Sequence, residues 1–397
     1  MSALVLLDHR RGDATADTLA PITTARPLAE VRVGARLIRE RWAMALGMPV
    51  AGVIAATRLT GFEEPGSAPV LRDTDMLDPG TIVASSHFAP VLQSIERNGT
   101  DTWTHRGVVV AATLTRRCSV ADIRSAGIVA ADRAGSLDGW SIDAPWDVIG
   151  HLPAMLASDA LTIARGALPR DVPPDVRVLG DFPVRIAESA VVEPFVVLDA
   201  TRGAIVLEAH TVVRSFSRLA GPFVLGAHSQ WMAGAGQTVS IGDHCKISGE
   251  VSTSILCGHA NKGHDGFLGH SYLGRWTNLG AGTVTSNLKN TYGPVSFAGQ
   301  ETGLQFLGSL IGDHAKTGIL TRLNTGSCIG AGANVISDDV VPRMVAAFAF
   351  GHRGERYDRS RFFETAVRVM ARRQVTLSSS MRACLGAVYD ATGGVTP

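Results

Sequence analysis

Cysteine and aromatic residues are scarce in this sequence, and neither sign of charge is in excess. The five cysteines lie far apart, from Cys118 to Cys384, without a C-x-x-C pair. This excludes a dense disulfide framework and favours reduced thiols in the cytoplasm. The formal net charge of +1 argues against nucleic acid as a partner. No run of roughly 18 uncharged apolar residues occurs, so we expect no membrane span.

Alternating strands and helices are predicted for about the first 170 residues. The apolar run at the N-terminus has charge after it and not before it, which is typical of a buried strand and not of a signal peptide. We therefore predict an α/β domain at residues 1–172, followed by a proline-rich linker. The predicted strands are residues 3–8, 81–86 and 107–114, and the predicted helices are residues 28–47, 90–99 and 140–165.

A six-residue repeat dominates the sequence from about residue 178 to residue 345. Five inward-type residues follow one another at this spacing: Leu207, Val213, Leu219, Leu225 and Trp231. The spacing fits neither an α-helix nor an ordinary strand, and it predicts a parallel β-helix whose coils have three flat faces. The rhythm fails between 253 and 310, where we expect an insertion to leave the prism as a loop.

The last part of the chain, residues 346–397, is predicted to be a helical extension. Residues 359–377 have apolar residues at helical spacing and a basic face.

Two long blocks, residues 246–295 and 302–336, closely resemble one family of hexapeptide-repeat proteins. This family is the alternative bacterial form of the bifunctional N-acetylglucosamine-1-phosphate uridylyltransferase / glucosamine-1-phosphate N-acetyltransferase. The segment "LAPITTARPLAEVRVGARLIRERW" and the segment "SIDAPWDVI" are similar to the opening and to the domain exit of the same family.

The resemblance implies a reduced nucleotidyltransferase-like domain followed by a left-handed parallel β-helix that assembles as a homotrimer. It implies transfer of acetyl from the cosubstrate acetyl-CoA to an amino sugar, either glucosamine 1-phosphate or a related amino sugar or nucleotide sugar. If the N-terminal domain is active, UTP and Mg²⁺ are further partners and the product is a UDP-sugar. The acceptor and the acyl group follow from the resemblance alone.

His264 falls where the related acetyltransferases carry their catalytic base, which takes a proton from the attacking amine. Asp265 adjoins it in the sequence, and Asn287 aligns with an asparagine that contacts substrate in the related enzymes. Lys289 is a candidate for sugar-phosphate binding, and Tyr292 is a weaker substrate-binding candidate. Each of these polar residues also has a simpler interpretation as a turn or surface residue.

The remaining candidates concern the thioester and acyl-CoA. Backbone N–H groups of Gly280, Ala281 and Gly282 are candidates for the oxyanion, because glycines let a ligand approach the main chain. Lys316 and Arg322, with Arg343, are candidates for the CoA phosphates. The segment "EVSTS" (250–254) departs from the better-known bifunctional enzymes, which carry phosphate-binding lysines there, so a phosphate on the acceptor stays open.

The N-terminal domain lacks the glycine-rich loop that usually holds a triphosphate, since only Gly12 follows the first strand. Arginines are the alternative nucleotide-binding groups, although Arg26 and Arg32 could equally pair with local acids such as Glu30. Carboxylates for Mg²⁺ are available, but nothing in the sequence fixes which ones bind. The arginine candidates are Arg10, Arg11, Arg26 and Arg32, and the carboxylate candidates are Asp73, Asp75 and Asp143.

Two other classes of function stay open. His259, His264 and His270 could take part in a zinc site like that of γ-class carbonic anhydrases, with a further ligand such as His228 or His244 from a neighbouring chain. Stoichiometric zinc, with activity lost on chelation, would select that reading. A non-catalytic regulatory or assembly protein is the other alternative, and absence of acetyl-CoA turnover would select it.

Overall fold

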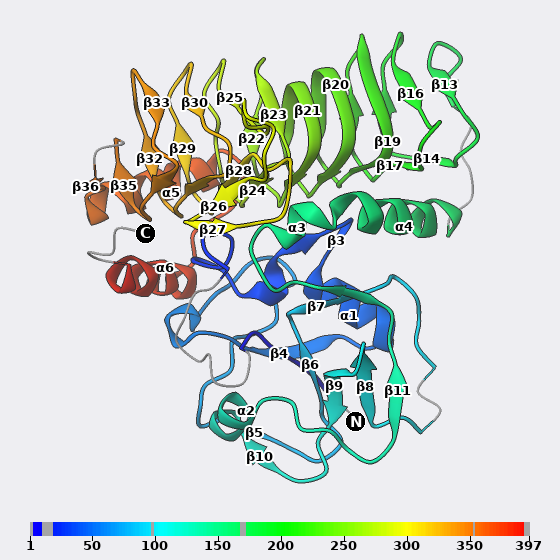
Figure 1. Cartoon of the computed structure of the whole chain (residues 1–397), viewed down its shortest axis with the longest axis vertical. Helices are drawn as coiled ribbons and strands as arrows, with labels where there is room; N and C mark the ends of the chain where they lie inside the picture. Colours follow the sequence, from blue (N-terminus) through cyan, green and yellow to red (C-terminus); the bar gives the residue numbers. More distant parts are fainter. Residues whose placement is uncertain (1–2, 10–18, 97–98, 167–171, 352–353, 393–397) are drawn as a thin grey trace.

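The computed structural model describes residues 3–9, 19–96, 99–166, 172–351 and 354–392. An α/β domain occupies the lower part of Figure 1, and a parallel β-helix lies across its top. Among the described residues, none of the helices combines the length and apolar character needed to cross a bilayer.

A six-stranded mixed sheet, in the order β11-β8-β9-β6-β1-β4, forms the centre of the α/β domain. The entirely apolar β1 lies between β4 and β6 and is parallel to both, as expected of a strand buried on both faces. β9 is antiparallel to β6 and β8, so the sheet is mixed and not wholly parallel. The strands are β1 (Leu4–Leu7), β4 (Val50–Ile54), β6 (Ile82–Ser85), β8 (Thr102–His105), β9 (Val108–Thr113) and β11 (Ala134–Ser136).

Short elements surround this sheet. They are η1 (Leu28–Glu30), β2 (Arg32–Val33), β3 (Arg36–Leu37), α1 (Ile38–Leu46), η2 (Thr57–Leu59), β5 (Met76–Leu77), β7 (Phe88–Pro90), β10 (Cys118–Ser119), α2 (Val120–Ala126), β12 (Gly139–Ser141), α3 (Asp147–Gly150) and α4 (Leu152–Arg165).

The helix predicted over residues 28–47 begins only at Ile38, so the first half of that prediction is wrong. Its place is taken by η1 and the hairpin β2–β3, which turns at Gly34 with φ +54°. A side chain on Gly34 would bring its Cβ to 2.2 Å from Asp159 Oδ2, so the turn requires glycine. Asp159 accepts a hydrogen bond from the Ala35 N–H at 2.8 Å and pairs with Arg41, which ties the hairpin to α4.

The helix predicted over residues 90–99 does not form in its described part. Pro90 instead ends β7, which pairs antiparallel with β12. The Ile95 N–H donates to the carbonyl of Ala45 at 2.7 Å, so this segment is held as a bend against α1. The helical exit predicted over residues 140–165 is confirmed from Asp147 onwards, in α3 and α4, whereas its start lies in β12 and the turn after it. Figure 1 shows α4 beneath the β-helix.

The six-residue repeat builds the predicted parallel β-helix. Its strands are β13 (Arg177–Leu179), β14 (Val184–Ile186), β15 (Val191–Val192), β16 (Val197–Asp199), β17 (Ile205–Leu207), β18 (Val212–Val213), β19 (Ser217–Leu225), β20 (Gln230–Ile241), β21 (Lys246–Leu256), β22 (Asn261–Lys262), β23 (Phe267–Gly269), β24 (Tyr272–Leu273), β25 (Val284–Thr285), β28 (Ser309–Ile311), β29 (Lys316–Thr317), β30 (Arg322–Leu323), β31 (Ser327–Ile329), β32 (Asn334–Val335), β33 (Val340–Val341), β34 (Met344–Val345) and β35 (Ala349–Phe350), with β36 (Glu355–Arg356) antiparallel to β35.

Aliphatic side chains stack in register from coil to coil inside the prism. Leu207 pairs with Leu225, which pairs with Ile241, and all three are fully buried. Leu273 pairs with Ile311, 38 residues further on, whereas Ile311 pairs with Ile329, only 18 residues further on. One coil therefore carries an insertion of about a full coil's length.

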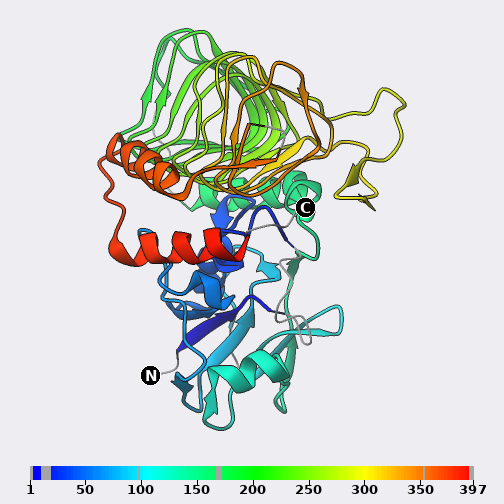
Figure 2. The same cartoon turned by 90° about the vertical axis from the view of Figure 1, so that its left-hand side faces the viewer.

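The inserted loop is shorter than the interval 253–310 over which the six-residue repeat fails in the sequence. Residues 253–285 stay in the prism, and residues 286–307 form the loop that projects from it in Figure 2. This loop contains the antiparallel pair β26 (Ser296–Phe297) and β27 (Gln300–Glu301). Phe297 packs edge-on against Trp146 of the domain exit, with ring centroids 5.8 Å apart.

A ladder of aromatic rings runs along one corner of the prism, which we call the corner ladder. Its members are His210, His228, His244, His259, Trp276 and His314. Each adopts a positive φ between 49° and 62°, which the tight corner imposes on successive coils. The four rings from His210 to His259 are spaced 4.7 Å apart, close to the separation of adjacent strands.

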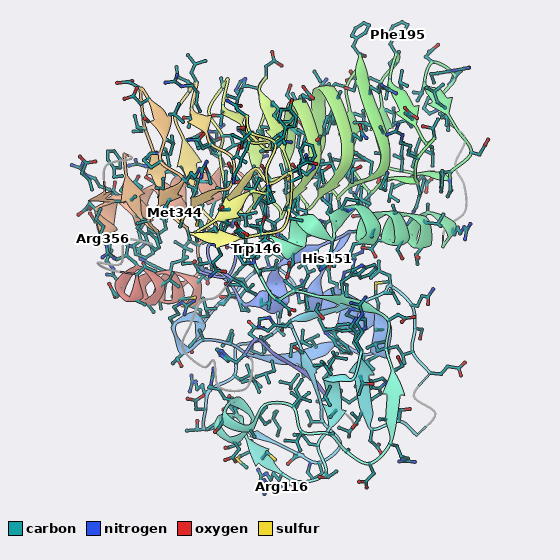
Figure 3. The ribbon with its side chains drawn as sticks, in the orientation of Figure 1. Arg116, Trp146, His151, Phe195, Met344 and Arg356 are labelled. Carbon is teal, nitrogen blue, oxygen red and sulfur yellow. The ribbon has the colours of Figure 1, made fainter. Side chains whose placement is uncertain are left out.

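Two helices follow the prism: α5 (Arg359–Ala371) and α6 (Ser379–Ala391). Figure 2 shows α5 beside the prism and α6 next to the α/β domain. Phe362 of α5 meets the end of the corner ladder at His314, with ring centroids 6.0 Å apart. The Ser378 hydroxyl before α6 donates to Glu63 at 2.6 Å, so the C-terminal segment contacts both domains. In Figure 3, Arg356 lies at this end of the molecule and Phe195 at the opposite end of the prism.

A chain of buried ion pairs joins the two domains, and we call it the junction network. Arg26 bonds Asp313 at 2.7 Å and Glu64 at 3.2 Å. Arg275 bonds Glu64 at 3.1 Å and Asp243 at 2.7 Å. Burial alone would raise the pKa of Glu64, but the two guanidiniums lower it below its ordinary value. Negative and positive side chains therefore alternate along the network, from Asp313 to Asp243. Arg26, which bridges the two domains, is only 1% exposed.

Candidate functional site

His264 lies on a corner of the prism, between β22 and β23. Its side chain and that of Asp265 are exposed, unlike the buried rings from His259 to His314 in the corner ladder. The next residue, Gly266, has φ +130°, and a Cβ there would lie 2.2 Å from the carbonyl oxygen of Thr283. Only glycine therefore fits at this corner, and the chain passes close to the following coil.

Lys262 holds this corner from inside. Its side chain is 2% exposed, and its Nζ donates to the carbonyl oxygens of Ser248 at 2.7 Å and His264 at 2.9 Å. Burial lowers the Lys262 pKa to about 8, although the nearby carboxylate of Asp265 acts in the opposite direction. The amine fixes the main chain of His264 and leaves its imidazole on the surface.

Gly280, Ala281 and Gly282 form the same corner of the prism on the following coil. The Gly282 N–H donates to the Asp265 carbonyl oxygen at 3.2 Å, which joins this corner to the His264 corner. The Gly280 N–H donates to Thr317 Oγ1 at 3.1 Å. Both amides thus have partners within the protein, and an oxyanion would have to replace them. Their role toward an oxyanion stays a prediction.

Asn287 lies at the start of the projecting loop and contacts His270. Its Nδ2 lies 2.8 Å from His270 Nδ1, whose ring stacks on Phe306 at 5.1 Å. Burial lowers the His270 pKa to about 4, so the neutral ring accepts the bond from the amide. Lys289 and Tyr292 lie further along the same loop, and the Tyr292 side chain is 69% exposed.

Lys316 and Arg322 lie on later coils. Lys316 Nζ donates to the carbonyl oxygen of His314 at 2.8 Å, and burial lowers the Lys316 pKa to about 8. Arg322 is exposed, pairs in register with Val284, and donates to the Asp338 carbonyl at 2.8 Å. Arg322 is thus available to a ligand on the outer face, whereas Lys316 has little exposed surface.

The three histidines of residues 259–270 have different surroundings. His259 is a buried member of the corner ladder, His264 is exposed at its corner, and His270 bonds Asn287. Within the described residues, the one group of three ligand-type side chains close enough to share an ion is Asp243, His244 and His259. Burial and Arg275 lower the His259 pKa to about 3, and Arg275 already bonds Asp243. This guanidinium disfavours a cation there.

A pocket of about 360 Å³ lies on the prism face that continues from the His264 corner. It contains the "EVSTS" segment, since Glu250 and Ser252 line it together with Arg202 and Arg218. Glu250 pairs in register with Phe267, three residues after His264. No short motif in the sequence marks Arg218, and coil stacking through Ala235 alone brings it to the face that holds Glu250.

The α/β domain has its own pocket, of about 590 Å³, at the carboxyl ends of β1 and β6. His9, Ser85, His87, His105 and Asp143 line it. In open α/β sheets, ligands bind at this edge. Neither His87 nor His105 was predicted from the sequence, although His87 directly follows the strand predicted at residues 81–86, which is a usable signal.

Neither Arg26 nor Arg32, the two predicted nucleotide-binding arginines among the described residues, lines this pocket. Arg26 belongs to the junction network, where its guanidinium has three protein partners, Asp313, Glu64 and the Glu30 carbonyl. Arg32 lines a different pocket at the domain junction. Arg10 and Arg11 lie outside the described residues. A phosphate would have to displace existing bonds to reach Arg26.

Of the predicted carboxylates, only Asp143 lines the pocket. Asp73 bonds Arg124 at 3.1 Å, and Asp75 accepts the Arg72 N–H at 2.8 Å. Asp8 precedes the pocket residue His9, and burial raises its pKa to about 6. The Asp143 carboxylate suits a Mg²⁺ ion that takes one protein carboxylate and fills its other coordination positions with phosphate and water oxygens.

Comparison with known proteins agrees with this architecture. Residues 12–167 match the sugar nucleotidyl transferase family. The chain is 29% identical over 207 residues to the bifunctional protein GlmU of Herminiimonas arsenicoxydans, covering 48% of this chain and 41% of that relative. It is 33% identical over 98 residues to the bifunctional protein GlmU of Methanococcus vannielii, covering 23% and 24%. The chain thus spans less than half the length of these curated relatives.

The chain thus joins a domain that matches the sugar nucleotidyl transferase family to a parallel β-helix. The similarity of parts of the chain to several GlmU proteins agrees with the resemblance found in its sequence.

Proposed function

We propose that the β-helix transfers acetyl from acetyl-CoA to the amine of an amino sugar, glucosamine 1-phosphate or a close relative. The observation that carries this proposal is the His264 corner. There an exposed imidazole stands on a main chain fixed by Lys262, next to a glycine corner that keeps side chains out of the way. Such rigid positioning of one base is what amine acylation needs.

In this reaction the amine nitrogen attacks the thioester carbonyl while His264 accepts its proton. The C–N bond forms and the C–S bond breaks, and the proton is available to the departing CoA thiolate. Asn287 and Lys289 border the acceptor on the projecting loop, and Arg322 offers charge to the CoA phosphates on the outer face. The exposure of His264 in a single chain fits a site completed by a neighbouring prism, as in a homotrimer.

We further propose that the α/β domain transfers a uridylyl group from UTP to the sugar phosphate. The 590 Å³ pocket supports this, because its volume suits a nucleotide and it lies at the ligand-binding edge of the sheet. Asp143 would hold Mg²⁺, which would neutralise charge on the phosphates. His87 is fixed by the carbonyl oxygens of Ile142 at 2.8 Å and Asp8 at 3.0 Å, so its ring forms a rigid wall.

An acceptor panel tests the acetyltransferase. Purified full-length protein with acetyl-CoA is expected to release CoA thiol with glucosamine 1-phosphate, and more slowly with glucosamine, since the pocket beside Glu250 contains Arg202 and Arg218. Thiol release is measured with a chromogenic disulfide and product by mass spectrometry. If no amino sugar is acetylated and the protein contains stoichiometric zinc, the proposal is wrong.

The uridylyl transfer is tested separately by pyrophosphate release from UTP and N-acetylglucosamine 1-phosphate. Asp143→Asn is expected to reduce the rate about 10²-fold or more, because a Mg²⁺ ligand loses its charge. Asp75→Asn is the matched control, since Asp75 lies outside the pocket and caps an exposed turn. Equal rates in both variants would remove Asp143 from the site, and no pyrophosphate release from the unchanged protein would reject the activity.

A further inference from the structure

A second polar pocket, of about 260 Å³, lies at the junction of the two domains. Arg32, Arg36 and Arg39, from the β2–β3 hairpin and α1, form one wall. Glu208 and Arg275, from the β-helix, belong to the opposite wall. It shares no lining residue with the 590 Å³ pocket or with the 360 Å³ pocket, so it is distinct from both proposed reaction sites.

Three of the four guanidiniums at this pocket face carboxylates. Arg36 bonds Glu208 at 2.7 Å, and Arg39 bonds Glu30 at 2.8 Å. Arg275 is held within the junction network. These groups neutralise one another, and each can remain charged at the interface without a ligand.

Arg32 is the exception. It is 6% exposed, and its Nε donates to Ser240 Oγ at 2.8 Å. Its Nη2 is buried and has no hydrogen-bond partner within the described part of the chain, nor does any carboxylate there form an ion pair with it. Burying a cation that has an unpaired hydrogen-bond donor costs free energy, unless an anion accepts a hydrogen bond from that donor. Arg32 therefore marks the point where an oxyanion would bind.

The rest of the pocket restricts the ligand. Five carboxylates also line it, and those of Glu30, Glu64 and Asp243 are paired with Arg39 and Arg275. Glu40 and Glu208 would repel a second negative group but accept hydrogen bonds from hydroxyl or ammonium groups. The volume of 260 Å³ lies below the range of about 300–1,000 Å³ that is usual for drug-sized ligands. This argues for a small metabolite and against a nucleoside triphosphate.

We propose that this junction pocket is an effector site for a small phosphate monoester that carries hydroxyl or ammonium donors, with Arg32 holding the phosphate. Because its walls come from both domains, a bound ligand stabilises their contact. Occupancy is thereby linked to the relative position of the two proposed reaction sites.

The test uses the full chain and O-phosphoethanolamine as probe, with inorganic phosphate and ethanolamine as separate arms. O-phosphoethanolamine is expected to raise the unfolding temperature by about 3 °C when saturating. Calorimetric titration is expected to show that Arg32→Met weakens its binding about 30-fold, as for loss of a charged hydrogen bond. Phosphate alone should bind more weakly, and ethanolamine alone should not bind.

Two variants make the result specific. Ala227→Leu narrows the pocket without changing its charge, and it should weaken binding even if Arg32→Met does not fold. Arg214→Met is the matched control, because Arg214 lies outside this pocket and the 360 Å³ pocket and pairs with Glu193. The proposal fails if the unchanged protein binds no probe. It also fails if both pocket variants retain binding within about threefold, or if Arg214→Met weakens binding as much as they do.

Discussion

Replacing His264 with glutamine is expected to lower the rate of acetyl transfer by about 10²-fold to 10⁴-fold, with little change in KM. Glutamine keeps a polar side chain on the exposed corner but cannot take the proton of the attacking amine. Lys262 bonds the main chain of residue 264 and not its side chain, so the corner should keep its shape. The measurement is steady-state thiol release with saturating acetyl-CoA.

His210→Gln is the matched control, because it removes another exposed histidine, at the far end of the corner ladder from Trp276. It should leave acetyl transfer unchanged. Pyrophosphate release by the α/β domain provides an internal check of folding in both variants. If His264→Gln retains more than about a tenth of the acetyl-transfer rate, the base must be sought elsewhere.

Replacing Arg26 with methionine is expected to destabilise the protein by about 3–5 kcal/mol. The substitution leaves two buried carboxylates, Asp313 and Glu64, close together with only Arg275 between the domains. The physical cost is that of an unpaired buried charge, which far exceeds the loss of a surface ion pair. Thermal or denaturant unfolding of the full chain measures the effect.

Arg214→Met is the appropriate comparison, since Arg214 is half-exposed and pairs with Glu193 on the surface of the prism. It should cost about 0–1 kcal/mol. Adding Asp313→Leu to Arg26→Met should restore part of the lost stability, because the stranded carboxylate is removed with its partner. A loss in Arg26→Met no larger than in Arg214→Met would show that the junction network does not hold the domains together.

The β-helix could be predicted from the sequence because its coils repeat a local rule. Every sixth residue faces inward, so Leu207, Leu219 and Leu225 are buried whatever lies elsewhere in the chain. The β2–β3 hairpin could not be predicted in the same way, since its apolar spacing is also that of a helix. Gly34 and its contact with Asp159, distant in sequence, decide between the two.

The candidate site could be predicted only in part, because some of its contacts join residues that are distant in the sequence. His264 was found through a continuous motif. Nothing in the local sequence distinguishes the buried Lys262 from an ordinary loop residue, because its hydrogen bond goes to the Ser248 carbonyl on the previous coil. The partners of Arg26 lie up to 287 residues away, so no local pattern distinguishes a phosphate-binding arginine from one that joins two domains.

The corner ladder has a consequence for how this chain can change in length. Ring stacking at 4.7 Å requires every coil to deliver one planar side chain, with positive φ, to the same corner. Gain or loss of a whole coil preserves that register, and so does an excursion such as residues 286–307 that leaves and rejoins the prism within one coil. The interval from His228 to His244 is two residues shorter than that from His210 to His228, yet the rings stay stacked, because the strand register shifts between Trp231 and Ala233. Variation in relatives of this prism should therefore lie in complete coils, in self-contained loops or at such register shifts.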